Sequence, residues 1–117
     1  MLKVYLASPY SNLDHEEAYR RALFATKVLL GEGIATFSPI VYGYQMRSLG
    51  EGWSFWGKFN ELWINWADII AVYCLPGWKR SVGVREEFTY AQKYEKTVLS
   101  YEDVPTMLKG LLECQDS

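Results

Sequence analysis

The sequence predicts an α/β protein, in which buried strands alternate with amphipathic helices along a chain of 117 residues. Three observations support this class. Short, nearly continuous hydrophobic runs such as residues 68–75 are typical of parallel strands buried on both faces. The segments between these runs place apolar residues three and four positions apart, which is the spacing of a helix face. Glycine and proline residues separate the two kinds of segment.

The first half of the chain contains two expected strands and one expected helix. Residues 2–7 form a hydrophobic strand, and Asp14 is typical of the helix start that follows it. Alanine and leucine residues then make an apolar stripe through residues 18–30, and glycines end this helix. Residues 34–38 are the second strand. Residues 41–52 hold three glycines and no clear period, so we predict a loop there.

The second half of the chain continues the alternation of strands and helices. Residues 53–67 are predicted to be a helix because aromatic side chains recur on one face. Residues 68–75 are the most hydrophobic strand, and residues 81–94 are the next helix. Residues 97–101 are predicted to be a fourth strand, and residues 104–113 a closing helix.

Strands and helices in this order indicate a three-layer sandwich of the flavodoxin-like or Rossmann-like kind, with a small parallel sheet of four to five strands. We expect residues 1–117 to form a single domain. In such sheets, ligands bind beyond the carboxyl ends of the strands, where the strand order reverses. The loops at residues 8–12 and 76–83 follow the first and third strands, so both are expected to border that crevice.

Composition narrows the possible partners. The net charge of −2 and the lack of a basic run argue against nucleic acid and membrane surfaces, and no apolar stretch has membrane-spanning length. A small molecule is the expected partner. Cys74 and Cys114 lie far apart and His15 is the single histidine, which excludes a standard zinc site and argues against a disulfide framework. The chain starts with a strand rather than a signal peptide, so we expect a cytoplasmic protein.

Glu87 is the strongest candidate for chemistry. If a helix starts after Ser81, then Val84, Glu87 and Ala91 share one face, whereas Glu86 points elsewhere. Glu87 is therefore directed at the apolar interior, a few residues below a loop rich in glycine, serine and basic residues. Burying an ionised carboxylate is costly unless the group is paired or used.

That loop is a candidate anion site. The free N–H groups of the helix start, the Ser81 hydroxyl and the Gly83 backbone, with Lys79 or Arg80 nearby, favour a phosphate. The alternative is an ordinary strand-to-helix turn with Ser81 as its N-cap. The local sequence does not decide between the two.

Three further polar residues each have a functional and a structural interpretation. Arg21, at the edge of an apolar stripe, either reaches a ligand phosphate or a carboxylate, or is a surface arginine whose stem lies along apolar side chains. Tyr5, in the first strand, either hydrogen-bonds Glu87 or is an ordinary core tyrosine. Asn60 stands on an aromatic helix face, where it faces a ligand or meets backbone groups.

Several motifs together resemble the nucleoside 2-deoxyribosyltransferase-like superfamily, which includes deoxynucleoside monophosphate N-glycosidases, and most closely a short branch of that group. The resemblance covers nearly the whole chain. The most specific motif is Ser81-x-Gly83-x-x-x-Glu87-x-x-x-Ala91. Supporting motifs are the opening strand and loop, the end of the second strand and the loop after the third, namely Val4-Tyr5-Leu6-Ala7-Ser8-Pro9-Tyr10-Ser11, Phe37-Ser38-Pro39-Ile40 and Pro76-Gly77-Trp78.

The resemblance implies an N-glycosidase that needs neither metal nor cofactor and acts on a 2′-deoxynucleoside 5′-monophosphate. Glu87 would attack C1′ of the sugar and form a covalent glycosyl-enzyme, which water then hydrolyses. Tyr5 would orient Glu87. Ser81 and Gly83 would hold the 5′-phosphate, and the remaining substrate-binding positions would be Ser8, Pro9, Tyr10 and Arg21.

Asn60 departs from the family pattern, because the family usually has an aspartate at this position. Asparagine donates hydrogen bonds but cannot act as a general acid, whose loss typically costs about 10²–10⁴-fold in rate. Asn60 therefore keeps open a nucleotide-binding module with little activity. A deoxyribosyltransferase that moves the sugar between bases is the other alternative, because the sequence does not show whether water or a second base reaches the intermediate. The family and the tryptophan-rich helix also predict a homo-oligomer.

Overall fold

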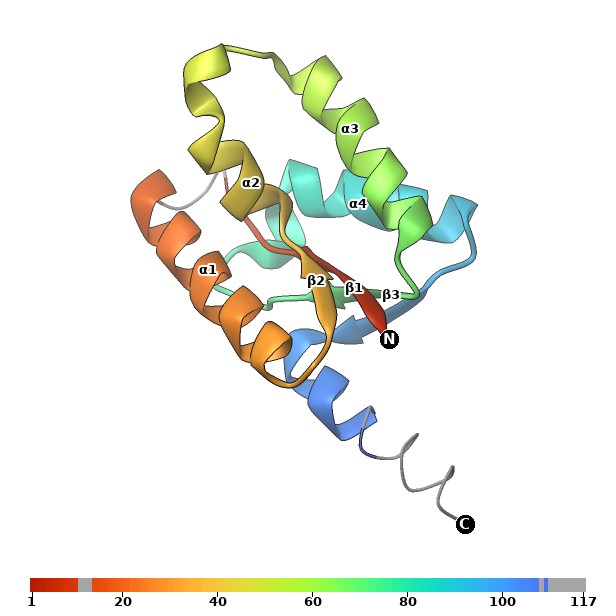
Figure 1. Ribbon diagram of the computed structural model, residues 1–117. Helices are drawn as coiled ribbons and strands as arrows, with labels where there is room; N and C mark the ends of the chain where they lie inside the picture. The colour runs from red at the N-terminus through yellow and green to blue at the C-terminus, as the bar shows by residue number, and fades with distance from the viewer. Residues whose placement is uncertain (11–13, 108, 110–117) are drawn as a thin grey trace.

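A four-stranded, all-parallel sheet forms the centre of the part of the chain that the computed structural model describes, residues 1–10, 14–107 and 109 (Figure 1). The strand order is β2-β1-β3-β4. Val4 of β1 pairs with Thr36 on one side and with Ile69 on the other, so β1 is central. The strands are β1 (Lys3–Ala7), β2 (Ala35–Phe37), β3 (Ile69–Val72) and β4 (Thr97–Ser100).

Helices cover both faces of this sheet, which confirms the predicted α/β sandwich. Helix α1 (His15–Gly31) packs on one face, and α3 (Trp53–Trp66) and α4 (Val82–Lys93) pack on the other (Figure 1). The closing helix begins at Val104, which is fully buried in the core on the α1 side. The rest of its predicted range, apart from residues 105–107 and 109, lies outside the described residues.

Short polar side chains cap the helices where the sequence changes from strand or loop to helix. Asp14 accepts a hydrogen bond from the Glu17 N–H at 3.1 Å, and Ser81 accepts one from the Val84 N–H at 3.3 Å. Each cap satisfies one of the N–H groups that a helix start leaves without an intrahelical partner. The Ser81 cap fixes the start of α4 directly after the β3 loop.

The predicted loop at residues 41–52 is wrong over much of its length. It contains most of α2 (Pro39–Gln45) and a short 3₁₀ helix, η1 (Arg47–Leu49). Ser38 caps α2 by accepting from the Val41 N–H at 3.2 Å, and proline is favoured at the first helical position. Tyr44 of α2 stacks on Tyr19 of α1 with ring centroids 4.3 Å apart. Packing on α1 therefore overrides the low helix propensity of Gly43.

Within the described ranges, no helix combines the length and the apolar character that crossing a bilayer requires.

Candidate functional site

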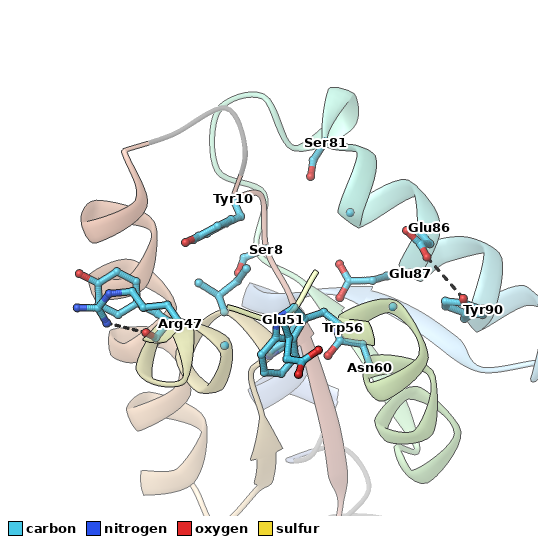
Figure 2. A pocket seen from close by; sticks show the side chains of 16 residues that line it. Ser8, Tyr10, Arg47, Glu51, Trp56, Asn60, Ser81, Glu86, Glu87 and Tyr90 are labelled. Carbon is cyan, nitrogen blue, oxygen red and sulfur yellow. Dashed lines mark hydrogen bonds between the residues drawn. The ribbon is translucent and has the colours of Figure 1, made fainter. Parts of the chain in front are cut away.

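A pocket of about 280 Å³ opens beyond the carboxyl ends of β1 and β3, at the point where the strand order reverses (Figure 2). This is the position that the sequence predicted. The residues after β1, the α2–η1 region, α3 and α4 each contribute to its lining, which comprises Ser8, Tyr10, Pro39, Ile40, Gly43, Tyr44, Arg47, Glu51, Trp56, Gly57, Asn60, Ser81, Gly83, Glu86, Glu87 and Tyr90.

Glu87 lies in this pocket as a buried carboxylate, only 8% exposed. Burial raises its pKa to about 8, and the negative charge of Glu86 adds to the rise, whereas the hydroxyl of Tyr5 favours the ionised form and lowers the pKa. The pKa of Tyr5 is itself raised well above its usual value, first by complete burial and then by the charge of Glu87. Strongly perturbed pKa values in a cleft are typical of functional groups.

Four buried side-chain atoms in the described residues have no hydrogen-bond partner: Tyr5 Oη, Ser8 Oγ, Asn60 Oδ1 and Glu87 Oε2. Three of these residues line the pocket, and the fourth, Tyr5, lies against Glu87. Tyr5 and Glu87 face each other without reaching standard hydrogen-bond geometry. Leaving a buried polar group unpartnered costs about 1–3 kcal/mol. Their gathering at one place makes this pocket the candidate ligand site.

The start of α4 forms the anion-binding end of the pocket. Ser81 and Gly83 both line it, and the Ser81 side chain points into it (Figure 2). Because Ser81 Oγ accepts the capping hydrogen bond, its own hydroxyl proton remains free to be donated to a ligand. Ser8, 4% exposed, adds a second hydroxyl from the residues after β1. These groups suit the phosphate predicted for this loop.

The basic residues of that loop lie elsewhere. Lys79 and Arg80 border a separate depression on the outer side of the β3–α4 loop, together with Cys74 and Trp78. In the described residues, the lysine or arginine that lines the main pocket is Arg47 of η1, at the side away from α4 (Figure 2). The support that Lys79 and Arg80 gave to a phosphate site is therefore removed.

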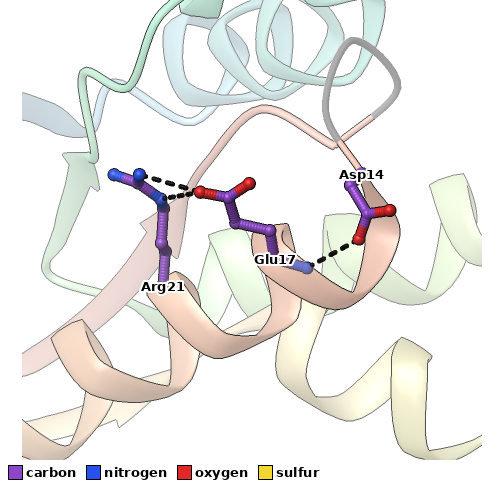
Figure 3. A network of polar contacts seen from close by, with 3 residues as sticks. All are labelled: Asp14, Glu17 and Arg21. Atoms are coloured by element: carbon purple, nitrogen blue, oxygen red, sulfur yellow. Dashed lines mark hydrogen bonds and ion pairs between the residues drawn. The ribbon is translucent and has the colours of Figure 1, made fainter.

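The other predicted binding residues divide into two groups. Tyr10 lines the pocket and stacks on His15, with ring centroids 4.1 Å apart. Pro9 is buried beside it but is not part of the lining. Arg21 donates from Nε and Nη2 to Glu17 Oε1 at 3.0 and 2.8 Å (Figure 3). The structure therefore contains its pairing with a carboxylate, and the pocket does not include Arg21.

Sequence reasoning missed several lining residues. Glu86 was expected to point away, yet it lines the pocket and accepts a hydrogen bond from Tyr90 Oη at 3.5 Å. Arg47 and Glu51 fall in the range predicted to be a loop, so no face could be assigned to them. Trp56 was recognised as part of an aromatic face, and it forms a flat wall of the pocket.

In the part of the chain that the structure describes, no group of three or more histidine, cysteine, aspartate and glutamate side chains is arranged so that it could hold a metal ion.

The fold and the pocket together define an α/β protein with a parallel sheet and a ligand-sized site at its topological switch point. Residues 2–103 match a family model described as a domain of unknown function, DUF1937. The chain belongs to this family, and the matched range contains every residue that lines the pocket. Among curated proteins, none matches the chain.

Proposed function

We propose that this protein is an N-glycosidase that hydrolyses the bond between base and sugar in a 2′-deoxynucleoside 5′-monophosphate. The observation that carries the proposal is Glu87, a buried carboxylate with an unpartnered oxygen in a pocket that also contains the start of α4. The resemblance in the Ser81-x-Gly83-x-x-x-Glu87 motif supports the same residue as nucleophile.

The proposed reaction has two steps. Ser8, Ser81 and the α4 N-terminus bind the phosphate, which brings C1′ of the sugar to Glu87. Glu87 attacks C1′ as the bond to the base breaks, and the departing nitrogen keeps the bonding electron pair and gains a proton. Water then cleaves the glycosyl ester, restores the Glu87 carboxylate and leaves a 2-deoxyribose 5-phosphate.

The protonation state of Glu87 controls the first step. A pKa of about 8 leaves the free protein with mostly protonated Glu87 at neutral pH, and the nucleophile must be ionised. Tyr5 favours the ionised form, so its proposed role is to position Glu87 and keep part of it charged.

The test is a product analysis. The protein is incubated with each deoxynucleoside monophosphate, with and without a second free base, and released base is measured by chromatography; Glu87→Ala is the control. Base release without an acceptor that disappears in Glu87→Ala supports hydrolysis. Product formed only with an acceptor indicates a deoxyribosyltransferase instead, and the absence of both products contradicts the proposal.

The second candidate is a nucleotide-binding module with little activity, and Asn60 is the observation that favours it, because its unpartnered Oδ1 lies where an acid would be useful. If the missing acid limits the rate, Asn60→Asp raises base release by up to about 100-fold. A nucleotide-binding module would instead bind nucleotide, which raises the melting temperature, and would release no base either as the wild type or as Asn60→Asp.

We also propose that this protein forms a homo-oligomer through the exposed face of α3. Phe55 and Leu62 of α3 are 47% and 70% exposed, and a second copy of the chain would cover such a surface. Sedimentation velocity that detects only monomer would remove this proposal.

A further inference from the structure

Glu86 is a second carboxylate at the pocket, and in the described residues no cation pairs with it. Its side chain is half-buried. Its hydrogen bond from Tyr90 Oη is long, at 3.5 Å. A carboxylate offers about four acceptor positions on its two oxygens. Glu86 therefore has acceptor capacity left over for a ligand in the pocket.

Glu61 is a carboxylate between the same two helices that has two short hydrogen bonds, one of them from a cation. Glu61 of α3 accepts from Lys93 Nζ at 2.8 Å and from Tyr94 Oη at 2.7 Å. These two hydrogen bonds lower its pKa. The lysine in the last turn of α4 is thus committed to Glu61, which leaves Glu86 without a cation.

Gly57 of α3 makes the room in which Glu86 lies. A Cβ atom at Gly57 would stand 3.0 Å from Glu86 Oε1, so a residue with a Cβ would require the carboxylate to shift by a few tenths of an ångström. Glycine inside a helix is destabilising relative to alanine. The close approach gives a physical reason for a glycine at this position.

The polar groups follow an order along the pocket. In Figure 2, Glu87 lies between Ser8 and Ser81 on one side and Glu86 and Tyr90 on the other. A nucleotide has the same order, because its sugar joins the phosphate to the base. With the phosphate at Ser81 and C1′ at Glu87, the base extends toward Glu86. Trp56 lines the same pocket and offers it a flat surface.

We infer that Glu86 recognises the base of the nucleotide through hydrogen bonds. It selects a base that carries an amino group next to a ring N–H, as guanine does. The inference rests on the proposed function. The two Glu86 oxygens match two adjacent N–H donors, which is the bidentate geometry of strong carboxylate recognition. Hypoxanthine keeps the ring N–H and lacks the amino group. In thymine the ring N–H stands between two carbonyl oxygens, which repel a carboxylate.

The experiment measures binding in the Glu87→Gln background, where turnover cannot interfere. Isothermal titration calorimetry gives the Kd of 2′-deoxyguanosine, 2′-deoxyinosine and thymidine 5′-monophosphates. The guanine nucleotide should bind tightest, by roughly 5- to 150-fold over thymidine monophosphate, the range for one bidentate contact to a base. Adding Glu86→Gln should remove most of this preference, and Gly57→Ala should reduce it by displacing the carboxylate. Glu61→Gln is the matched control and should leave it unchanged.

Two results would overturn the inference: equal affinities for the three nucleotides, including no binding of any, or a guanine preference that survives Glu86→Gln. Its failure is distinct from failure of the proposed function. Wild-type protein that releases other bases equally well keeps the N-glycosidase proposal and refutes the role of Glu86. A guanine preference that depends on Glu86, in a protein that releases no base, would support the role of Glu86 and refute the N-glycosidase proposal.

Discussion

The two faces of the sheet differ in what they bury. Val4 and Leu6 of β1 point to the α1 side, where they join a cluster of apolar side chains that includes Ala25 and Leu29. Tyr5 and Ala7, which alternate with them, point to the side of α3 and α4. The four unpartnered polar atoms belong to residues on this second side or to the pocket beyond the strand ends.

The difference indicates a division of roles within one strand. Thr26, a buried polar residue of α1, donates to the Ala22 carbonyl at 2.7 Å, so among the described residues the α1 side contributes mainly to stability. The α3–α4 side gives up part of its stability to hold polar groups ready for a ligand, as functional sites commonly do. Adjacent residues of β1 can therefore be used to test each role separately.

The largest effect on folding is expected from Leu6→Ala. Leu6 is fully buried, and removing a buried leucine side chain costs about 2–5 kcal/mol. Urea unfolding should show this loss, while the rate of base release per folded molecule stays as in the wild type. A large drop in that rate would mean that the two faces are not independent.

Tyr5→Phe should show the opposite pattern. The lost hydroxyl has no standard hydrogen bond, so the free energy of unfolding should change by less than about 1 kcal/mol. Without Tyr5 the pKa of Glu87 rises further and less of it is ionised. Base release at pH 7 should fall roughly 10-fold for each unit by which the pKa of Glu87 rises, because the ionised fraction falls by the same factor. Partial recovery at higher pH would separate this effect from misfolding.

A further prediction concerns the pH dependence of stability. The folded pKa of Glu87 is about 8 and its ordinary value is 4.5, so the folded protein binds the extra proton between these values. Stability should therefore fall as the pH rises through this window, with a slope of up to about 1.4 kcal/mol per pH unit. Glu87→Gln should flatten that slope, because the amide does not titrate. An unchanged slope would assign the dependence to other groups.

The sequence predicted the fold well because its strands are hydrophobic and its main helices have clear periods. The inward direction of Glu87 followed from the positions of Val84 and Ala91, which are both buried on the same face. Helix α2 was missed because its glycine and its lack of a clear apolar period outweighed the helix-start signal of Ser38 and Pro39, and its stacking against Tyr19 joins residues far apart in the sequence.

Glu86 was misplaced for a related reason. Its direction was judged from its own helix, whereas the space it enters is created by Gly57 on another helix. Contacts of this kind join residues far apart in the sequence, and a single sequence does not reveal them. The same limit explains why Lys79 and Arg80 were grouped with the pocket.

The four unpartnered atoms also have a consequence for the lifetime of the protein in a cell. A ligand that supplies partners to the three of them that line the pocket, on Ser8, Asn60 and Glu87, binds only the folded form, and at a concentration of 100 times its Kd it adds about 2.7 kcal/mol to the free energy of unfolding. Proteases act mainly on transiently unfolded molecules, so such a gain slows degradation. The abundance of this protein should then follow the supply of its own ligand.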